Sequence, residues 1–389
     1  MVNALLIESC DFVSFPIGGQ LSFARQMMMA FGNRLALVGV STDDTPVGKW
    51  IKKDIDGIDY DYFAFAHRQV RGKKPSIPAR ITGYLAVRKF NKQILSKGIK
   101  CVFIQSPEIL IAVHTWGWRS ICYCFPGVEN PLQMPRYGWG KMFAGLYEKK
   151  LFSTLRNVDT ILASADDEAI ADLVDKSCGE LYSERVIKFP TRVDTDVFKP
   201  LDKNVVRAEL GIVQTDNIIV SCGRLNLVKG WDFLLEAFKV VKRSNPYTKL
   251  IFVGDGEDRQ KLNDKAQELG IESSIIVTGF VGADSVVKYL NASDLYVVGS
   301  LKEGWSVAML EALACGKPIV STAVSGARDM IVEGANGFVI DGRDPKQFAE
   351  AMNSALALKE ADKVSLGIAD KYTLKNLAID LGKFWKPLA

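Results

Sequence analysis

Residues 303–318 read Glu-Gly-Trp-Ser-Val-Ala-Met-Leu-Glu-Ala-Leu-Ala-Cys-Gly-Lys-Pro, and this stretch decides how the C-terminal half of the chain folds. Ser306 is a good N-cap, because its hydroxyl can accept a hydrogen bond from an amide that the first helical turn leaves unpaired. Gly316 suits the left-handed position after a last turn, and Pro318 prevents the helix from continuing. The stretch therefore predicts a helix over residues 307–315.

Two carboxylates flank the start of this helix. Glu303 precedes it, and Glu311 falls on its second turn. The free amides of a helix N-terminus attract phosphate, whereas carboxylates repel it. We therefore expect the amides to face a phosphate and the two carboxylates to accept hydrogen bonds from sugar hydroxyls, one of a ribose and one of a hexose. An amphipathic helix with two solvated glutamates is the alternative interpretation.

The length and composition indicate a globular protein of two domains. The chain has 389 residues, 48% of them hydrophobic and 24% charged, without a fixed-period repeat or a low-complexity tract. No apolar run approaches the roughly 18 residues that span a bilayer, and the N-terminus lacks the basic region and cleavage site of a signal peptide. The seven cysteines form neither a disulfide framework nor a zinc pattern. These features predict a cytoplasmic, soluble or peripheral protein with reduced thiols.

From about residue 217 onward, short apolar runs alternate with helical periodicity, which is the pattern of β-α units on a parallel sheet. The predicted strands are 217–222, 249–253, 274–278, 294–298 and 318–322. A second α/β sheet is predicted in the N-terminal half, with a helix from about Leu21 and strands at 4–7, 35–40, 101–104, 121–125 and 160–163. Residues 193–201 read as the connection between the two domains.

The segment Gly223-Arg224-Leu225-Asn226-Leu227-Val228-Lys229-Gly230 follows directly on a predicted buried strand and leads into a helix. Its glycines allow close approach of the backbone, and its two cations project toward one place. This arrangement favours anion binding by Arg224 and Lys229. Ordinary surface charges at a strand end are the alternative.

The spacing of Glu303 and Glu311, together with Gly-Trp-Ser, Leu-Glu-Ala-Leu-Ala-Cys-Gly and Lys-Pro-Ile-Val in the same order, resembles the Glu-x7-Glu signature of glycosyltransferase family 4. That family is retaining and has the GT-B fold. Residues 223–230 are similar to its Gly-Arg-Leu-x3-Lys-Gly element. The resemblance is strong over residues 220–340 and loose in the N-terminal half.

The resemblance implies an α/β protein of two Rossmann-like domains that face each other across a cleft. Residues 1–198 would form the acceptor-side domain and residues 199–369 the domain that binds a nucleotide-sugar donor. Residues 370–389 would cross back onto the N-terminal domain, with a helix over 370–385.

The resemblance also assigns roles to individual residues. Arg224 and Lys229 would stabilise the departing nucleotide, Glu303 would position the transferred sugar, and Glu311 would hold ribose. Further donor-binding candidates match the glycine turns, the base-lining loop and the helix start of the family: Gly18, Gly19, Gly223, Gly254, Phe280, Val281, Gly304, Trp305, Ser306 and Val307.

Two places depart from the family. Pro126 stands where many members have a histidine that contacts the transferred sugar, and the usual Asn-Gly-Val-Asp reads Thr191-Arg192-Val193-Asp194. The two histidines of the chain, His67 and His114, match no such position. No histidine role is therefore carried over, and a structural role is expected for His114.

Three Asp-x-Asp pairs could hold Mg²⁺ or Mn²⁺ on a diphosphate, namely Asp54 with Asp56, Asp59 with Asp61, and Asp194 with Asp196. The first two lie in a spaced, surface-like acidic stretch and the third in the interdomain connection. Because the two cations of the 223–230 segment already supply positive charge, we expect no metal and no cofactor. The donor is expected to be UDP- or GDP-linked and to act as a substrate.

A basic segment lies in the N-terminal half. Residues 62–94 contain no acid and eight basic residues: Arg68, Arg71, Lys73, Lys74, Arg80, Arg88, Lys89 and Lys92. Residues 68–92 could bind an anionic membrane surface, hold the phosphate of an acceptor, or form a solvated face. The net charge of +4 and the lack of a recognised motif disfavour nucleic acid as a partner.

The sequence thus predicts a retaining, metal-independent hexosyltransferase that moves a sugar from a nucleoside-diphosphate sugar to a hydroxyl of a glycan or lipid-linked glycan. Biosynthesis of a cell-surface polysaccharide or lipopolysaccharide, at the inner face of a membrane, is the expected setting. Two other functions stay open. One is a non-catalytic nucleotide-sugar-binding partner protein, suggested by Pro126 and the altered Thr191-Arg192, and the other is a nucleotide-sugar epimerase.

Overall fold

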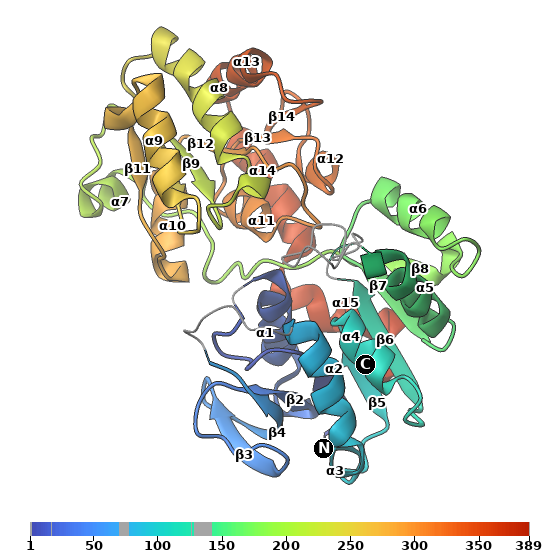
Figure 1. The fold of residues 1–389 in the computed structure, drawn as a ribbon. Helices are drawn as coiled ribbons and strands as arrows, with labels where there is room; N and C mark the ends of the chain where they lie inside the picture. The colour runs from blue at the N-terminus through green and yellow to red at the C-terminus, as the bar shows by residue number, and fades with distance from the viewer. Residues whose placement is uncertain (1, 17, 70–77, 126, 128–141, 389) are drawn as a thin grey trace. The chain divides into compact units, whose positions relative to one another are not determined.

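The computed structural model describes the chain except residues 1, 17, 70–77, 126, 128–141 and 389, and it divides into two compact units (Figure 1). Unit 1 comprises Met1–Thr191 and Lys375–Ala389, and unit 2 comprises Arg192–Leu374. The chain therefore passes between the units after Thr191 and after Leu374, whereas the sequence places these boundaries after residues 198 and 369.

Unit 1 is built on an eight-stranded sheet of order β3-β4-β2-β1-β5-β6-β7-β8. All neighbouring strands are parallel except β3 and β4, which are antiparallel. The strands are β1 Ala4–Ile7, β2 Leu35–Ser41, β3 Trp50–Ile55, β4 Ile58–His67, β5 Cys101–Ile104, β6 Ser120–Phe125, β7 Thr160–Ala163 and β8 Val186–Lys188. The five strands predicted from the sequence are confirmed to within one residue at each end.

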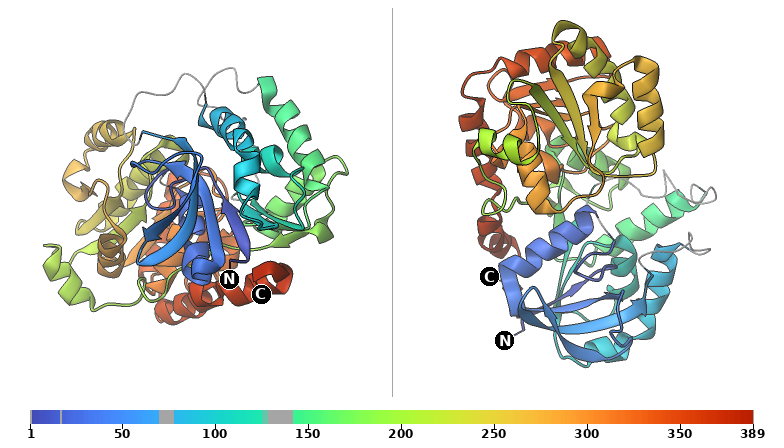
Figure 2. Two further views of the ribbon diagram at one scale, coloured as in Figure 1. Left: turned by 90° about the horizontal axis from the view of Figure 1, so that it is seen from below. Right: turned by 90° about the vertical axis from the view of Figure 1, so that its left-hand side faces the viewer.

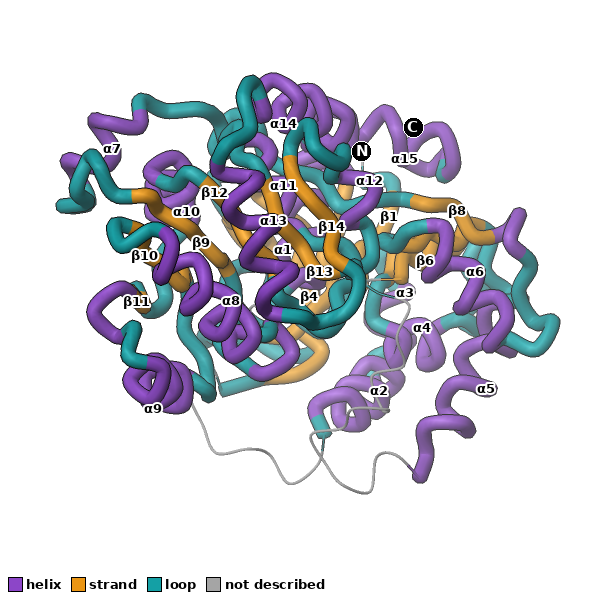
Figure 3. The backbone as a smooth tube through the Cα atoms, turned by 90° about the horizontal axis from the view of Figure 1, so that it is seen from above, coloured by secondary structure: helices purple, strands orange, loops and turns teal. Residues whose placement is uncertain are grey.

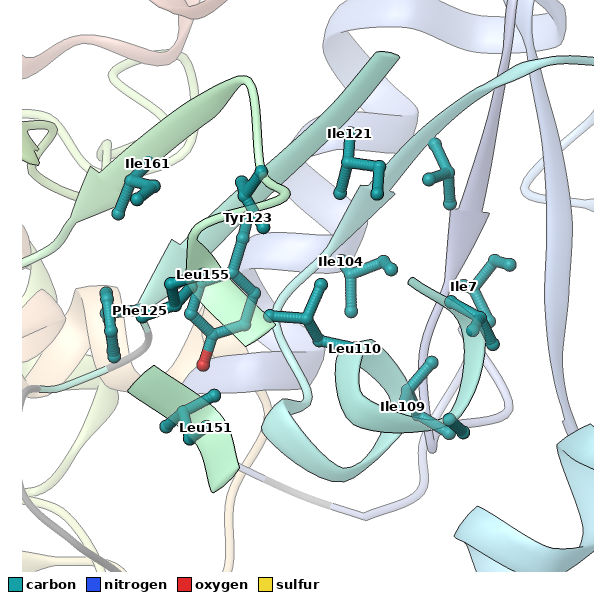
Figure 4. Packing of buried hydrophobic residues seen from close by; sticks show 14 of the residues in the cluster. Ile7, Ile104, Ile109, Leu110, Ile121, Tyr123, Phe125, Leu151, Leu155 and Ile161 are labelled. Atoms are coloured by element: carbon teal, nitrogen blue, oxygen red, sulfur yellow. The ribbon is translucent and has the colours of Figure 1, made fainter. Parts of the chain in front are cut away.

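Helices cover both faces of this sheet, because the alternate side chains of each buried parallel strand are apolar on both faces. The helices are α1 Gly19–Phe31, α2 Ala79–Lys89, α3 Asn91–Leu95, α4 Pro107–Val113, α5 Ala144–Leu155, α6 Asp167–Lys176 and α15 Leu377–Phe384. Figure 4 shows Ile7, Ile104 and Ile121 of the strands packing with side chains of α4 and α5. On the opposite face, Phe103 contacts Phe23 of α1 and Trp385 at the end of α15.

The N-terminal half contains a hairpin where the sequence predicts a spaced, surface-like acidic stretch. β3 and β4 pair antiparallel, with Asp54 opposite Asp59. Asp56 and Gly57 form the two-residue turn, with φ of 54° and 80°. Two successive left-handed residues match the right-handed twist of the strands, and Asp-Gly is a favoured pair for such a turn. The dipeptide is therefore the local signal that predicts this hairpin.

The C-terminal segment is less regular than the single helix predicted over 370–385. The helix α15 spans only Leu377–Phe384, preceded by short 3₁₀ turns. Thr373 interrupts the helix because it pairs with Val193 as an isolated β-bridge. The prediction that the segment joins the N-terminal domain agrees with its place in unit 1, where the Trp385 indole donates to Ser120 Oγ at 2.9 Å.

Unit 2 contains a six-stranded parallel sheet of order β11-β10-β9-β12-β13-β14. Its strands are β9 Asn217–Cys222, β10 Thr248–Val253, β11 Ile275–Val277, β12 Leu295–Val298, β13 Ile319–Thr322 and β14 Gly337–Ile340. The first five are the strands predicted from the sequence, again to within one residue. The short strand β14 was not predicted.

The sheet of unit 2 lies between two layers of helices, as Figure 2 shows. The helices are α7 Lys203–Glu209, α8 Trp231–Ser244, α9 Arg259–Leu269, α10 Ala283–Ala292, α11 Val307–Ala314, α12 Ala327–Met330, α13 Pro345–Leu356 and α14 Ala361–Ala369. α8 and α13 pack side by side on one face (Figure 3), and α11 and α14 pack on the other. Because the helices cover the two faces of the sheet, the loops that follow the strands form its edge at the carboxyl ends.

Candidate functional site

The strand order of unit 2 brings together the loops that follow three adjacent strands. β9 lies between β10 and β12, and the order of connection reverses at β9. Open α/β sheets bind ligands at the carboxyl ends of the strands at such a switch point. A hollow that is open to solvent lies there, and residues lining it include Gly223, Lys229, Ser300, Glu303 and Ser306.

Two strand ends approach closely at the edge of this hollow. A Cβ on Gly254 would lie 2.0 Å from the carbonyl oxygen of Gly223, and the φ of Gly254 is +148°. Any other residue would clash there and strain the backbone. Gly223 and Gly254 therefore let the loops after β9 and β10 approach closely.

The hollow contains a close ion pair between two predicted catalytic residues. Lys229 Nζ lies 2.6 Å from Glu303 Oε1, and Ser300 Oγ donates to the same oxygen at 2.7 Å. Glu303 Oε2 accepts no hydrogen bond from any residue that the structure describes. The Glu303 side chain is 13% exposed and that of Lys229 37%. One carboxylate oxygen is thus held in place while the other is available to a ligand.

The second predicted cation has a different partner. Arg224 Nε lies 3.0 Å from Glu257 Oε2, and both side chains are more than half exposed. Exposed pairs of this kind contribute little to stability because water screens them. Arg224 also lines the hollow, so its guanidinium can exchange this surface partner for a ligand phosphate at low cost.

The start of helix α11 borders the same hollow. Ser306 Oγ accepts from the Met309 amide at 3.4 Å, which confirms the predicted N-cap, and the helix ends at Ala314 before Gly316, whose φ is +71°. The amides of the first turn and the helix dipole favour an anion at this end. Positive charge from Lys229 and from the helix therefore converges on one volume.

Glu311 lies on the second turn of α11 and is half-buried, in apolar surroundings that raise its pKa to about 8. Within the described part of the chain, its carboxylate forms no side-chain hydrogen bond or ion pair, whereas its carbonyl oxygen accepts from the Cys315 amide. Its charge contributes to raising the pKa of the Cys222 thiol, which burial raises most. Cys222 and Tyr296 line the hollow, whereas Glu311 is not among its lining residues. Glu311 therefore lies near the hollow, and its ribose-binding role stays a prediction.

The remaining predicted donor residues lie in several places. Gly304 lies two residues before Ser306 and Val307 directly follows it, while the exposed Phe280 and the half-buried Val281 follow β11. Trp305 is buried, with its ring packed against Gly326 and Tyr372, and it does not line the hollow.

Gly18 and Gly19 belong to unit 1, where Gly18 precedes helix α1. The predicted roles of the binding residues in both units remain predictions.

The aspartate pairs have other partners. Asp56 is bound by Arg25, and Asp61 by Lys97 and Lys52. Asp194 Oδ1 accepts from the Asp196 amide at 3.0 Å, as in a local turn. Within the described ranges, no three His, Cys, Asp or Glu residues lie close enough together to share a metal ion.

Other residues singled out from the sequence take structural positions. Thr191 and Arg192 are buried where the chain passes from unit 1 to unit 2. His114 is half-buried, and its Nδ1 lies 3.0 Å from the Ile111 carbonyl oxygen, consistent with the structural role expected for it. Pro126, Arg71, Lys73 and Lys74 lie outside the described residues.

Sequence reasoning missed two polar residues. Ser300 donates a hydrogen bond to Glu303 and so orients its carboxylate. The sequence signal for this role is that Ser300 lies three residues before Glu303 on the loop after β12. In unit 1, Glu8 directly follows the first strand, and its burial raises its pKa to about 8. Glu8 accepts from Ser106 Oγ at 2.6 Å and from the Gln105 amide. Ser106 therefore does not cap helix α4, although it occupies the N-cap position.

Comparisons with known proteins point to one group. Residues 202–365 match the family described as "Glycosyl transferases group 1". The D-inositol 3-phosphate glycosyltransferase of Geodermatophilus obscurus is 31% identical over 211 residues, which are 52% of this chain and 46% of that protein. The chain thus matches about half the length of this curated relative.

Solved structures resemble the whole fold. Sucrose-phosphate synthase from Thermosynechococcus elongatus has a TM-score of 0.77 at 17% identity, covering 99% of this chain and 98% of that one. Anabaena HepE in complex with UDP and glucose has a TM-score of 0.73 at 16% sequence identity. WaaG, a glycosyltransferase involved in lipopolysaccharide biosynthesis, has a TM-score of 0.70 at 18% identity. Each of these two alignments covers 98% of this chain and 99% of the other chain. These likenesses confirm the GT-B fold.

Proposed function

We propose that the protein transfers a sugar from a nucleoside-diphosphate sugar to a hydroxyl of an acceptor, on the premise that residues 202–365 match the family described as "Glycosyl transferases group 1". The observation that carries the proposal is the Lys229–Glu303 pair beside the capped start of α11, at the switch point of the sheet. A cation and a helix N-terminus suit a diphosphate, and a carboxylate suits sugar hydroxyls.

The proposed chemistry is electrostatic and proceeds with retention. Lys229, Arg224 and the α11 amides would stabilise negative charge on the diphosphate as its bond to the sugar breaks. Glu303 would hold the sugar hydroxyls beside a cationic transition state, and the acceptor would attack from the face that the nucleotide leaves. Interactions that strengthen as charge develops accelerate the reaction, whereas uniform binding does not.

The two cations would serve in place of a divalent metal. Lys229 and Arg224 can neutralise a diphosphate directly. We therefore propose that transfer needs no added metal, and equal rates in EDTA and in Mg²⁺ would support this. A rate that EDTA abolishes and Mn²⁺ restores would contradict it.

The proposed donor class predicts selective stabilisation by one nucleotide, a nucleoside diphosphate rather than the monophosphate CMP. A panel of UDP, GDP, ADP and CMP is compared by thermal unfolding, because a ligand at a hundred times its dissociation constant adds about 2.7 kcal/mol to the folded state. The HepE structures contain UDP or UDP-glucose, so UDP is expected to give the largest thermal shift. Lys229→Met should make the shift smaller at the same nucleotide concentration. The absence of a shift with every nucleotide would argue against the donor assignment.

The two other functions give different outcomes with the same donor. An epimerase would isomerise the sugar of the donor when no acceptor is present. A non-catalytic binding protein would be stabilised by the nucleotide yet release none from the donor with any acceptor. A transferase releases nucleotide in proportion to the glycosylated product.

The acceptor is proposed to be a glycan or lipid-linked glycan of a cell-surface polysaccharide or lipopolysaccharide, presented at a membrane. The described part of the basic segment includes α2, where Arg88, Lys89, Ile81 and Leu85 are exposed. Basic and apolar side chains together on a helix suit an anionic membrane surface. No helix of the described residues has the length and hydropathy needed to cross a membrane.

Neutralising two cations of α2 is expected to weaken binding to anionic vesicles. Each basic residue near such a surface contributes about 1 kcal/mol, so Arg88→Gln with Lys89→Gln should weaken binding about 30-fold. The measurement is co-sedimentation with phosphatidylglycerol vesicles, compared with phosphatidylcholine vesicles. Lys261→Gln with Lys265→Gln on α9 changes the net charge equally and serves as the control. Equal binding by both double variants would contradict the proposed surface.

A further inference from the structure

Two segments that carry the ion pair cross each other in unit 2. The 3₁₀ turn Leu227–Lys229 follows β9, and residues 299–303 follow β12. The Leu301 amide donates to the Val228 carbonyl oxygen at 2.8 Å. This backbone contact determines the separation of Lys229 and Glu303, because Lys229 directly follows Val228 and Glu303 lies two residues after Leu301.

The crossing depends on a glycine. Gly230 has a φ of +67°, and a Cβ there would lie 1.8 Å from the carbonyl oxygen of Gly299. A side chain would therefore separate the segments. The Gly299 carbonyl lies against the backbone of Gly230, and its position determines the path of the loop that carries Glu303.

Arg343 holds that carbonyl from a third part of the chain, between β14 and α13. Its Nη1 donates to the Gly299 oxygen at 2.6 Å, and its Nη2 would lie 3.0 Å from a Cβ on Gly230. The guanidinium lies over the Phe233 ring, 4.4 Å from the centroid, and 3.9 Å from Asp232 Oδ1. Arg343 thus contacts both segments, yet it does not line the hollow.

We propose that Arg343 is a positioning residue for the donor site, acting through the segments that carry Lys229 and Glu303. The inference rests on the proposed function, and it adds a residue outside the hollow to the binding machinery. The planar guanidinium can bind the Gly299 carbonyl and stack on Phe233 simultaneously, which fixes its own orientation. Among the described residues, a neutral side chain would leave the crossing to the Leu301–Val228 backbone hydrogen bond and the Lys229–Glu303 ion pair.

The affinity for UDP, measured by titration calorimetry, tests this proposal. Because a small misplacement of a binding group weakens its contacts strongly, Arg343→Met should weaken UDP binding about tenfold. Arg343→Lys keeps a charged donor for the Gly299 carbonyl and should restore part of the loss. Arg328→Met removes another cation of unit 2, one paired with Asp341 on the surface, and should leave the affinity unchanged.

The decisive comparison is made in a Lys229→Met background. If Arg343 acts through Lys229, Arg343→Met should cause little further loss there, because coupled residues are not additive. Fully additive losses, or an unchanged affinity in the single variant, would overturn the proposal. Circular dichroism and thermal unfolding establish that each variant is folded.

The test remains informative if wild type binds neither UDP nor GDP, an outcome that would contradict the proposed donor. The coupling between Lys229→Met and Glu303→Gln is then measured by urea unfolding without ligand, in wild type and in Arg343→Met. Coupling that disappears in Arg343→Met supports the positioning role. Coupling that is equal in both backgrounds refutes it.

Discussion

Glu303→Gln is expected to lower kcat about a hundredfold, comparable to the loss when a single group that stabilises a transition state is removed. The amide keeps the shape of the side chain but loses the charge that faces the developing positive sugar. The dissociation constant for UDP should stay the same or decrease, because Lys229 loses its 2.6 Å partner and becomes free for the diphosphate. Steady-state kinetics and titration calorimetry measure the two quantities separately.

A matched control and a contrary result make this prediction specific. Glu350→Gln on the exposed face of α13 removes a carboxylate from the same unit and should change neither quantity. An unchanged kcat in Glu303→Gln would remove Glu303 from the site. Equal losses in kcat and UDP affinity would instead assign it to ground-state binding.

Glu311→Gln is expected to stabilise the unliganded protein in neutral solution. The pKa of Glu311 rises from an ordinary 4.5 in the unfolded chain to about 8 in the folded one. Ionisation therefore favours the unfolded state as pH rises from about 4.5 to 8, and the native protein loses stability across that range. The variant should gain about 4 kcal/mol in unfolding free energy at pH 7.5 and little at pH 4.5.

The measurement is urea unfolding of wild type and variant at several pH values. Glu8 has a similarly raised pKa, so only the difference between proteins that differ at residue 311 isolates the contribution of Glu311. Glu350→Gln again provides the control and should show no such dependence on pH. A constant difference between wild type and Glu311→Gln from pH 4.5 to 8 would mean that Glu311 ionises as an ordinary surface residue. A ribose-binding role predicts, in addition, that Glu311→Gln weakens UDP binding.

The ion pair also bears on how a donor would bind. Lys229 is engaged with Glu303 in the unliganded protein, so in the proposed function a diphosphate competes with that carboxylate for the ammonium group. Glu303 then accepts hydrogen bonds that the sugar hydroxyls donate.

Local sequence determined much of this protein. Ser306, Gly316 and Pro318 bound α11 because caps and breakers act within a few residues. The strands of both sheets followed from continuous apolar runs, which buried parallel strands require. The Asp56-Gly57 turn was overlooked even though its signal is equally local, while β14 is too short for a clear pattern.

Only the tertiary structure decided which side chains meet. Lys229 and Glu303 are 74 residues apart, and Arg343 and Gly299 are 44 apart. Sequence motifs suggested that Lys229 and Glu303 belong to one site. No periodicity or spacing predicts that Ser300 and Lys229 share one oxygen of Glu303 or that Arg343 stacks on Phe233. Nor does any pattern predict the burial that raises the pKa of Glu311. These depend on the order of strands in the sheet and on packing around it, because distances between loops and the solvent around a carboxylate exist only once the chain is folded.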